Sequence, residues 1–195
     1  MPLLINVDDR VEALTIAINN ILILEGPAGL TMRRIARESG ISTSSMLHHL
    51  DSKERLIRLS ALATARARHA DISVRSRSEG ALAFLPAHPD QVLDARAWLA
   101  WLELWRSEES LQSTLARARD SERALLAQTL DFTLTTESLD ATVALIDGLG
   151  AAVCSPVRPM SPDRARAALS RHLGRVPLGV DVTPRRPEVS SWVTP

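Results

Sequence analysis

The sequence predicts an all-α protein. It is rich in Ala, Leu and Arg, lacks tyrosine and has only short runs of β-branched residues, so helix is favoured over strand throughout. Apolar residues recur at helical spacing in successive segments, and glycine or proline separates these segments. With 195 residues and 45% hydrophobic content, the chain can build one ordinary domain or two small ones around a real core.

Two helices are expected at the start of the chain. The first covers about residues 11–24 and is followed by the glycine-containing connection EGPAGLT. Thr31 then offers an N-cap oxygen for a second helix, in which Met32 and Ile35 repeat at helical spacing. This helix is expected to stop at Gly40, because glycine tolerates the left-handed backbone of a sharp helix exit.

A third helix is expected over residues 43–50, after a second cap at Ser42. Its apolar residues Met46, Leu47 and Leu50 can face inward, while the hydroxyl and imidazole side chains point outward. Two short helices joined by a tight turn form a helix-turn-helix, whose second helix meets base edges with its N-terminal residues. Short hydroxyls there can bond bases or phosphates. The pattern therefore predicts DNA contacts from Thr31, Arg33, Ser42, Thr43, Ser44, Ser45 and His48.

This region resembles the DNA-binding domain of the TetR family of transcriptional regulators. The resemblance covers the opening helix, the connection EGPAGLT, and the segments TMRRIARESG, ISTSSMLHHL and DSKERLI. It implies that His49 and Lys53 hold phosphates and close the small core. Leu47, Leu50 and Ser44 stand where tyrosine, phenylalanine and glycine are common in the family. These departures suggest an operator of unusual sequence or modest affinity.

The alternative is a helix-turn-helix that only packs and no longer binds DNA. The flanking helix, the serine cap and the downstream Ser52-Lys53-Glu54 favour DNA binding over this alternative. The chain is neutral overall, yet residues 31–77 hold ten basic residues against four acidic ones. Such a local excess is what phosphate contact needs, although solvated helix faces also produce one.

The rest of the chain is expected to be helical up to about residue 174. A long helix over about residues 51–76 leads out of the head, and a short apolar stretch follows at 81–85. Prolines then punctuate the chain, and Pro162 is placed to start the last helix. The later helices are expected at residues 89–106, 109–133, 137–154 and 162–173. From residue 175 onward, prolines without apolar periodicity predict an extended or disordered tail.

This second half is similar in layout to the ligand-binding and dimerisation domain of the TetR family. We therefore expect a helix-turn-helix DNA-binding domain over residues 1–55, a helical ligand-binding and dimerisation domain over 56–174, and a tail over 175–195. The expected partners are a double-stranded DNA operator, a small-molecule effector and a second copy of the chain. We expect a repressor that the effector releases, with the long helix after the head as the lever.

Three of the four tryptophans share one helix face. Trp98, Trp101 and Trp105 fall at i, i+3 and i+7. Packing in the core or in a dimer interface would explain this spacing. The other explanation is an aromatic wall for a small apolar or cationic effector, with Phe84 and Phe132 as further walls.

The segment at residues 137–154 combines an apolar stripe with small residues, which permits close helix packing. Together with residues 162–173 it is expected to form a four-helix bundle about a two-fold axis. Burial of the stripe inside one subunit is the competing explanation. The stripe consists of Leu139, Val143, Ile146, Leu149 and Val153, and the small residues are Ala144, Gly148, Ala151 and Ala152.

Catalytic motifs are missing from the sequence. The histidines lack metal-ligand spacing, and there is no phosphate-binding glycine loop or nucleophile elbow, so we expect no enzyme activity, metal or cofactor. A helical-bundle enzyme is the weaker alternative. No apolar run approaches the ~20 residues that cross a bilayer, and the N-terminus lacks a signal-peptide pattern. We therefore expect a cytoplasmic protein without a membrane partner, in which Cys154 is a small buried apolar residue rather than a redox sensor.

Overall fold

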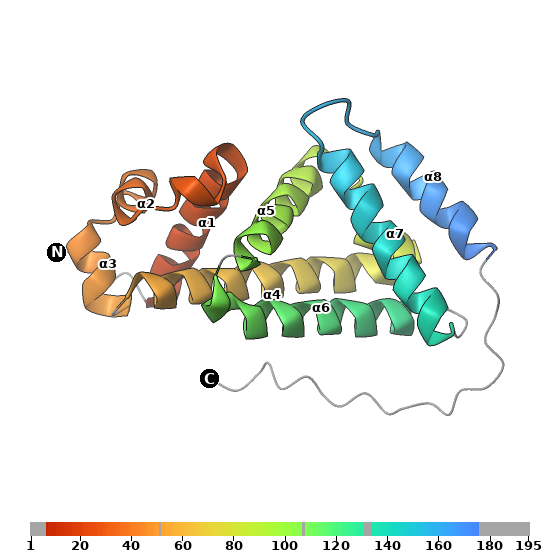
Figure 1. Cartoon of the computed structure of the whole chain (residues 1–195), viewed down its shortest axis with the longest axis horizontal. Helices are drawn as coiled ribbons and strands as arrows, with labels where there is room; N and C mark the ends of the chain where they lie inside the picture. The colour runs from red at the N-terminus through yellow and green to blue at the C-terminus, as the bar shows by residue number, and fades with distance from the viewer. Residues whose placement is uncertain (1–6, 51, 107, 131–133, 176–195) are drawn as a thin grey trace. The chain divides into compact units, whose positions relative to one another are not determined.

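The computed structural model describes residues 7–50, 52–106, 108–130 and 134–175. This part of the chain is helical and contains no strand (Figure 1), which confirms the all-α prediction. Its elements are α1 (Val7–Glu25), η1 (Pro27–Gly29), α2 (Met32–Ser39), α3 (Thr43–Leu50), α4 (Lys53–Glu79), η2 (Gly80–Phe84), α5 (Pro89–Trp105), α6 (Glu109–Thr129), α7 (Thr136–Cys154) and α8 (Pro162–Leu173). None of these helices is long and apolar enough to cross a membrane.

The helix ends follow the predicted signals closely. The Thr31 hydroxyl accepts a hydrogen bond from the Arg34 N–H at 3.2 Å, and Gly40 ends α2 in the left-handed region at φ 70°. The Ser42 hydroxyl accepts the N–H of Ser45 at 3.2 Å. Both helices of the helix-turn-helix therefore begin, and α2 ends, where their capping residues predict.

Several features differ from the expected elements or lie outside the described residues. The 3-10 helix η1 was not expected within the connection before α2, and α4 extends three residues beyond the predicted end, to Glu79. The predicted end of the 109–133 helix falls on residues 131–133, outside the described part of the chain. Residues 176–195, which make up nearly all of the expected tail, also lie outside it.

The chain divides into two compact units. The first contains residues 1–71 and 86–118, and the second contains residues 72–85 and 119–195. This division describes packing, so the functional boundaries expected at residues 55 and 174 stay a prediction.

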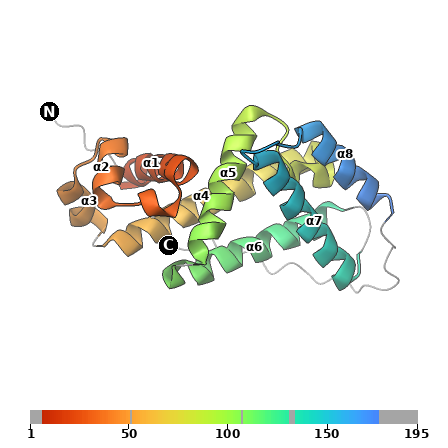
Figure 2. The ribbon, with the colours of Figure 1, turned by 45° about the horizontal axis from the view of Figure 1, so that its top comes forward.

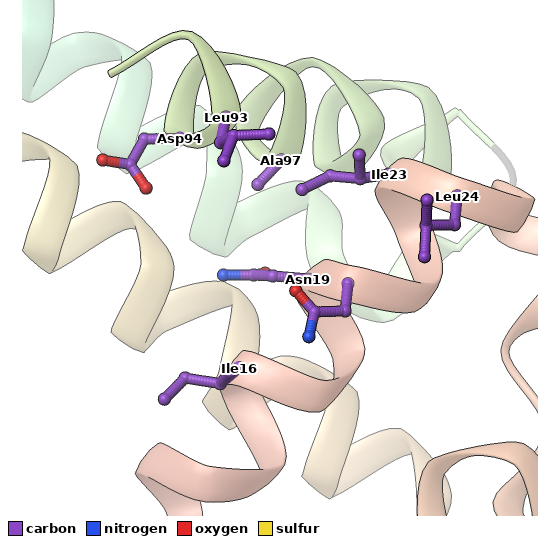
Figure 3. A pocket seen from close by; sticks show the side chains of 8 residues that line it. Ile16, Asn19, Ile23, Leu24, Leu93, Asp94 and Ala97 are labelled. Atoms are coloured by element: carbon purple, nitrogen blue, oxygen red, sulfur yellow. The ribbon is translucent and has the colours of Figure 1, made fainter. Parts of the chain in front are cut away.

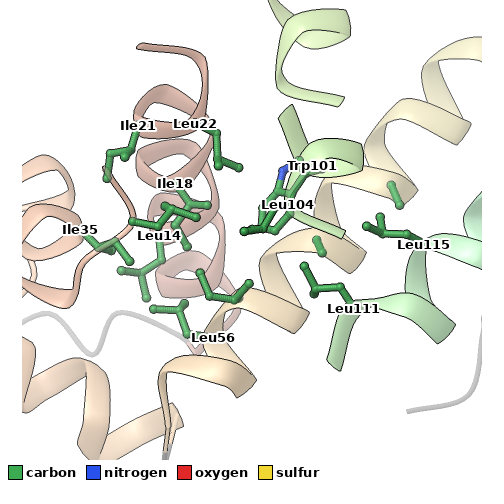
Figure 4. Packing of buried hydrophobic residues seen from close by; sticks show 14 of the residues in the cluster. Leu14, Ile18, Ile21, Leu22, Ile35, Leu56, Trp101, Leu104, Leu111 and Leu115 are labelled. Carbon is green, nitrogen blue, oxygen red and sulfur yellow. The ribbon is translucent and has the colours of Figure 1, made fainter. Parts of the chain in front are cut away.

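The first unit has one apolar core, built around α1 (Figure 4). Leu14, Ile18 and Ile21 are fully buried on the inner face of α1, which packs against both α2 and α5. Burial of such side chains stabilises the fold by about 1.5–3 kcal/mol each. Other large members of the core are Ile35, Met46, Leu56, Trp101, Leu104, Leu111 and Leu115.

The second unit pairs α7 with α8, which lie side by side (Figure 2). Ile146 and Leu149 of α7 are buried, as is Leu169 of α8. The guanidinium of Arg166 on α8 binds Glu79 at 2.8 Å and donates to the Leu82 carbonyl at 2.9 Å. These contacts fix η2 against α8.

Candidate DNA-binding surface and ligand site

One face of α3 is turned outward from the core. Thr43, Ser44 and His48 are exposed, Ser45 is half-buried, and Met46 is only 2% exposed. The predicted outward and inward positions agree with this arrangement. The side chains of Leu47, His49 and Leu50 lie outside the described residues, so the phosphate contact expected of His49 stays a prediction.

Thr31 and Ser42 both cap the helix that follows them, and this role limits how far their hydroxyls can also contact DNA. The hydroxyls of Thr31 and Ser42 each accept a backbone N–H of the helix that follows. The Ser42 hydroxyl also lies 3.1 Å from that of Ser44. These residues therefore position α2 and α3, while Thr43 and His48 lie exposed on the surface of α3.

Two neighbouring arginines of α2 have different surroundings. Arg33 is exposed, as a phosphate contact requires. Arg34 instead bridges two carboxylates, with Nε 2.7 Å from Glu25 Oε1 and Nη1 2.7 Å from Glu38 Oε2. Asn20 Nδ2 donates to Glu38 Oε1 at 3.2 Å. Arg34, followed by Asn20, holds the pKa of Glu38 below its usual value by hydrogen bonding to the charged carboxylate.

This ion-pair network ties α2 to α1, and sequence reasoning missed it. The i,i+4 spacing of Arg34 and Glu38 was a readable signal for part of it. The bond from Asn20 and the pairing with Glu25 depend on the packing of α1 against α2, which spacing alone does not give.

Lys53 is the first residue of α4 and is half-buried. The Ser52 hydroxyl caps this helix by accepting the N–H of Arg55 at 3.1 Å. Arg55 and Arg58 are exposed on the following turn. An anion beside a helix N-terminus is favoured by both the free N–H groups and the lysine charge, so this position suits a phosphate.

The tryptophans lie on one face of α5, as predicted, and that face is packed into the core of the first unit. Trp98 is 3% exposed, Trp101 is 0% exposed and Trp105 is half-buried against the same core. The Arg68 guanidinium carbon lies 5.5 Å from the centroid of the Trp98 ring, so the chain itself places a cation on that ring.

The predicted five-residue aromatic wall is only partly described. Phe84 is buried in the second unit and Phe132 lies outside the described residues. The effector contacts of these phenylalanines and of the three tryptophans therefore stay a prediction. For Trp101, complete burial favours the packing explanation that the spacing left open.

Asn19 forms a hydrogen-bonding centre that the sequence did not reveal. Its Oδ1 accepts the indole N–H of Trp101 at 2.8 Å and the hydroxyl of Thr64 at 3.2 Å. One side chain of α1 thereby binds both α4 and α5. Asn19 also borders an open groove of about 350 Å³ between α1 and α5 (Figure 3).

Comparisons with known proteins agree on one class of protein. Residues 17–59 match the model of bacterial regulatory proteins of the tetR family. A transcriptional regulator from Rhodococcus sp. Rha1 has a similar structure, with a TM-score of 0.76 at 20% identity over 89% of this chain and 99% of that one. A putative TetR-family transcriptional regulator from Rhodococcus sp. gives a TM-score of 0.71 at 20% identity, over 86% and 98% of the two chains.

The multidrug binding protein EbrR, in its complex with ethidium, gives a TM-score of 0.56 at 21% identity, over 87% of this chain and 99% of that one. The comparison with curated proteins gives no match.

The helix-turn-helix head and the helical fold define a DNA-binding transcriptional regulator. Residues 17–59 match the head of the tetR family, and the described chain shares its fold with the two Rhodococcus regulators. A match to the DNA-binding head of a regulator family agrees with the expectation that the chain is not an enzyme.

Proposed function

We propose that the chain is a homodimeric, cytoplasmic repressor that leaves its operator when a small molecule binds. The observation that supports operator reading best is the outward-facing side of α3, which exposes Thr43, Ser44 and His48 while Met46 is buried. Hydroxyl and imidazole groups can bond base edges in the major groove. Arg33 and Lys53 are assigned to phosphates, which fix the register but carry no sequence information.

A dimer is proposed because a two-half-site operator needs two heads, and α7 offers a suitable surface. Ile146 and Leu149 of the apolar stripe are buried within the second unit, so intrachain packing explains those side chains. A different face of α7 is exposed and is made of small residues at helical spacing. These residues, Ala141, Ala144, Gly148 and Ala151, permit close approach of a helix from a second copy.

A small-molecule effector is proposed from the helical domain and from the behaviour of a structural neighbour. EbrR is described as a multidrug binding protein and has been captured with ethidium. In the present chain, the buried Trp98 Nε1 has no acceptor among the described residues. A buried donor without a partner costs about 1–3 kcal/mol, so an effector that supplies an acceptor there would gain affinity. The effector binds more tightly to the dimer state whose two heads do not fit successive major grooves, and it thereby increases the population of that state.

Binding to the DNA upstream of the chain's own gene tests this function. At two salt concentrations the full-length chain should protect a two-fold symmetric site, with affinity falling steeply as salt rises. At defined operator positions, His48→Ala should reduce the difference in binding free energy between the preferred base and the others by about 1–3 kcal/mol. Ser113→Ala, an exposed change on α6, is the control. Equal affinity for all duplexes, with no altered preference in His48→Ala, would contradict the assignment of α3 to base reading.

A further inference from the structure

The groove between α1 and α5 has the size of a small-molecule site. Its volume of about 350 Å³ lies at the lower end of the range found for ligand pockets. Both helices belong to the first unit, so the groove is a feature of one packed body. Its lining comes from Ile16, Asn19, Asn20, Ile23 and Leu24 of α1 and from Leu93, Asp94 and Ala97 of α5 (Figure 3).

The groove gathers apolar surface that the fold leaves in water. In the described part of the chain, five large apolar side chains are exposed, and three of them line this groove. Ile16 is 55% exposed, Leu24 is 74% exposed and Leu93 is 49% exposed. Single exposed apolar residues are ordinary, but a cluster around a concave surface marks a binding site. A ligand with an apolar body would remove this surface from water.

The polar groups of the groove indicate the chemistry of the other end of the ligand. Asp94 is exposed on the α5 side, and the amides of Asn19 and Asn20 lie on the α1 side. Asp94 already takes part in a polar interaction, and a carboxylate has acceptor sites for more than one donor. Among the residues that the structure describes, no basic side chain lines the groove. The lining therefore complements an amine with an apolar body.

Both asparagines also hold α1 to other helices. Asn19 accepts hydrogen bonds from Trp101 of α5 and Thr64 of α4. Asn20 donates to Glu38 of α2, which Arg34 also binds. A ligand in the groove thus touches the side chains that set the position of α1 against the helix-turn-helix and against the long helix α4. Any change in these contacts alters the relative stability of head positions, and binding of ligand and operator must then affect each other reciprocally.

We propose that the α1–α5 groove is an effector site for small amphipathic amines and that it acts on DNA binding through Asn19 and Asn20. This inference rests on the proposed function only in taking the chain to be ligand-responsive. The proposed effector site lies in the first unit, on the face of α5 that carries Leu93 and Asp94, rather than on the tryptophan face of that helix.

Phenethylamine is a suitable probe, with 2-phenylethanol as its uncharged counterpart. Titration calorimetry and ligand-observed NMR with the full-length chain should show saturable binding of phenethylamine with a Kd of about 1 mM, as expected for a ligand of this size. The alcohol should bind about two- to fivefold more weakly, because an exposed charge pair is worth less than about 1 kcal/mol.

Variants locate the probe. Asp94→Asn should weaken phenethylamine about two- to fivefold and leave 2-phenylethanol unchanged. Asp90→Asn removes the same charge one turn earlier on α5, outside the groove lining, and should leave both affinities unchanged. Leu93→Trp narrows the groove and should weaken both compounds. Unfolding midpoints of all three variants check that the fold is retained.

The outcomes separate this site from its alternatives. No saturation of phenethylamine up to about 10 mM, or equal affinity in Asp94→Asn and Asp90→Asn, would overturn the proposal. A change in oligomeric state with Leu93→Trp, in place of a change in probe affinity, would show that a second copy covers the groove and would also overturn it. Operator binding measured without probe tests the proposed function separately, since its loss would leave the probe titrations interpretable.

Discussion

Removing the Asn19 side chain should lower the free energy of unfolding by more than its half-buried position suggests. Its Oδ1 is the acceptor for both the Trp101 indole, at 2.8 Å, and the Thr64 hydroxyl, at 3.2 Å. Asn19→Ala deletes that acceptor without adding volume. Trp101 is 0% exposed in the intact protein, so its N–H depends on this carbonyl for its hydrogen bond. The variant therefore leaves a buried donor unpaired.

The two donors are not affected equally. An unpaired buried N–H costs about 1–3 kcal/mol. The Thr64 hydroxyl can rotate toward a backbone carbonyl of the preceding turn, as helical threonines often do, and should lose little. We therefore expect Asn19→Ala to lower the free energy of unfolding by about 2 kcal/mol. The adjacent Asn20→Ala removes only an exposed bond to Glu38 and should cost less than about 0.5 kcal/mol.

Urea unfolding at one fixed chain concentration, followed by circular dichroism, measures these differences. A double-mutant cycle with Trp101→Phe isolates the bond, because phenylalanine keeps the aromatic ring but has no N–H. The double variant should be about 1 kcal/mol less destabilised than the sum of the single variants. Additive effects in this cycle, or equal losses in Asn19→Ala and Asn20→Ala, would show that Asn19 does not hold α5 to α1 through Trp101.

Three further predictions follow from the head and from α7. Lys53→Ala should weaken all duplexes alike and reduce the slope of log affinity against log salt by about one per subunit, measured by fluorescence anisotropy; an unchanged slope would exclude a phosphate contact. The pKa of Glu38 is lowered by Arg34, so its contribution to stability is present above about pH 4.5 and lost as pH falls further; Glu38→Gln should make urea midpoints less sensitive to acid. Gly148→Gln should stabilise each chain by about 0.5–1 kcal/mol, because the position is helical and an added Cβ meets no atom within 4 Å. If α7 forms the dimer contact, the same variant should sediment more as a monomer.

The helices of the head were predictable because their signals are local. Thr31, Ser42 and Gly40 act on backbone groups within four residues, so the sequence determines where α2 and α3 begin and where α2 ends. Proline gave the same kind of information at Pro89 and Pro162, each of which is the first residue of its helix. The all-α class follows from these signals together with composition.

The polar links between helices were not predictable for the opposite reason. Asn19 and Trp101 are 82 residues apart in the chain, and nothing in either local pattern shows that they meet. The tryptophan spacing predicted one shared face correctly, but spacing cannot distinguish a face turned to a ligand from one turned to the core. That distinction depends on α1 packing over α5, which is a property of the fold.

The hydrogen bonds of Asn19 also bear on how an effector signal would reach DNA. Thr64 lies eleven residues after Lys53 on the uninterrupted helix α4, a separation of about 16 Å along the helix axis. A continuous helix transmits displacement along its length, so the bond between Asn19 and Thr64 and the proposed phosphate contact of Lys53 belong to one rigid element. Asn20, through Glu38, reaches α2 in parallel. A ligand beside the two asparagines would therefore act on both ends of the DNA-binding surface, α2 and the start of α4, without contacting α3. Its effect should fall on phosphate positioning and hence on affinity for all duplexes, while the base preference set by Thr43 and His48 is retained.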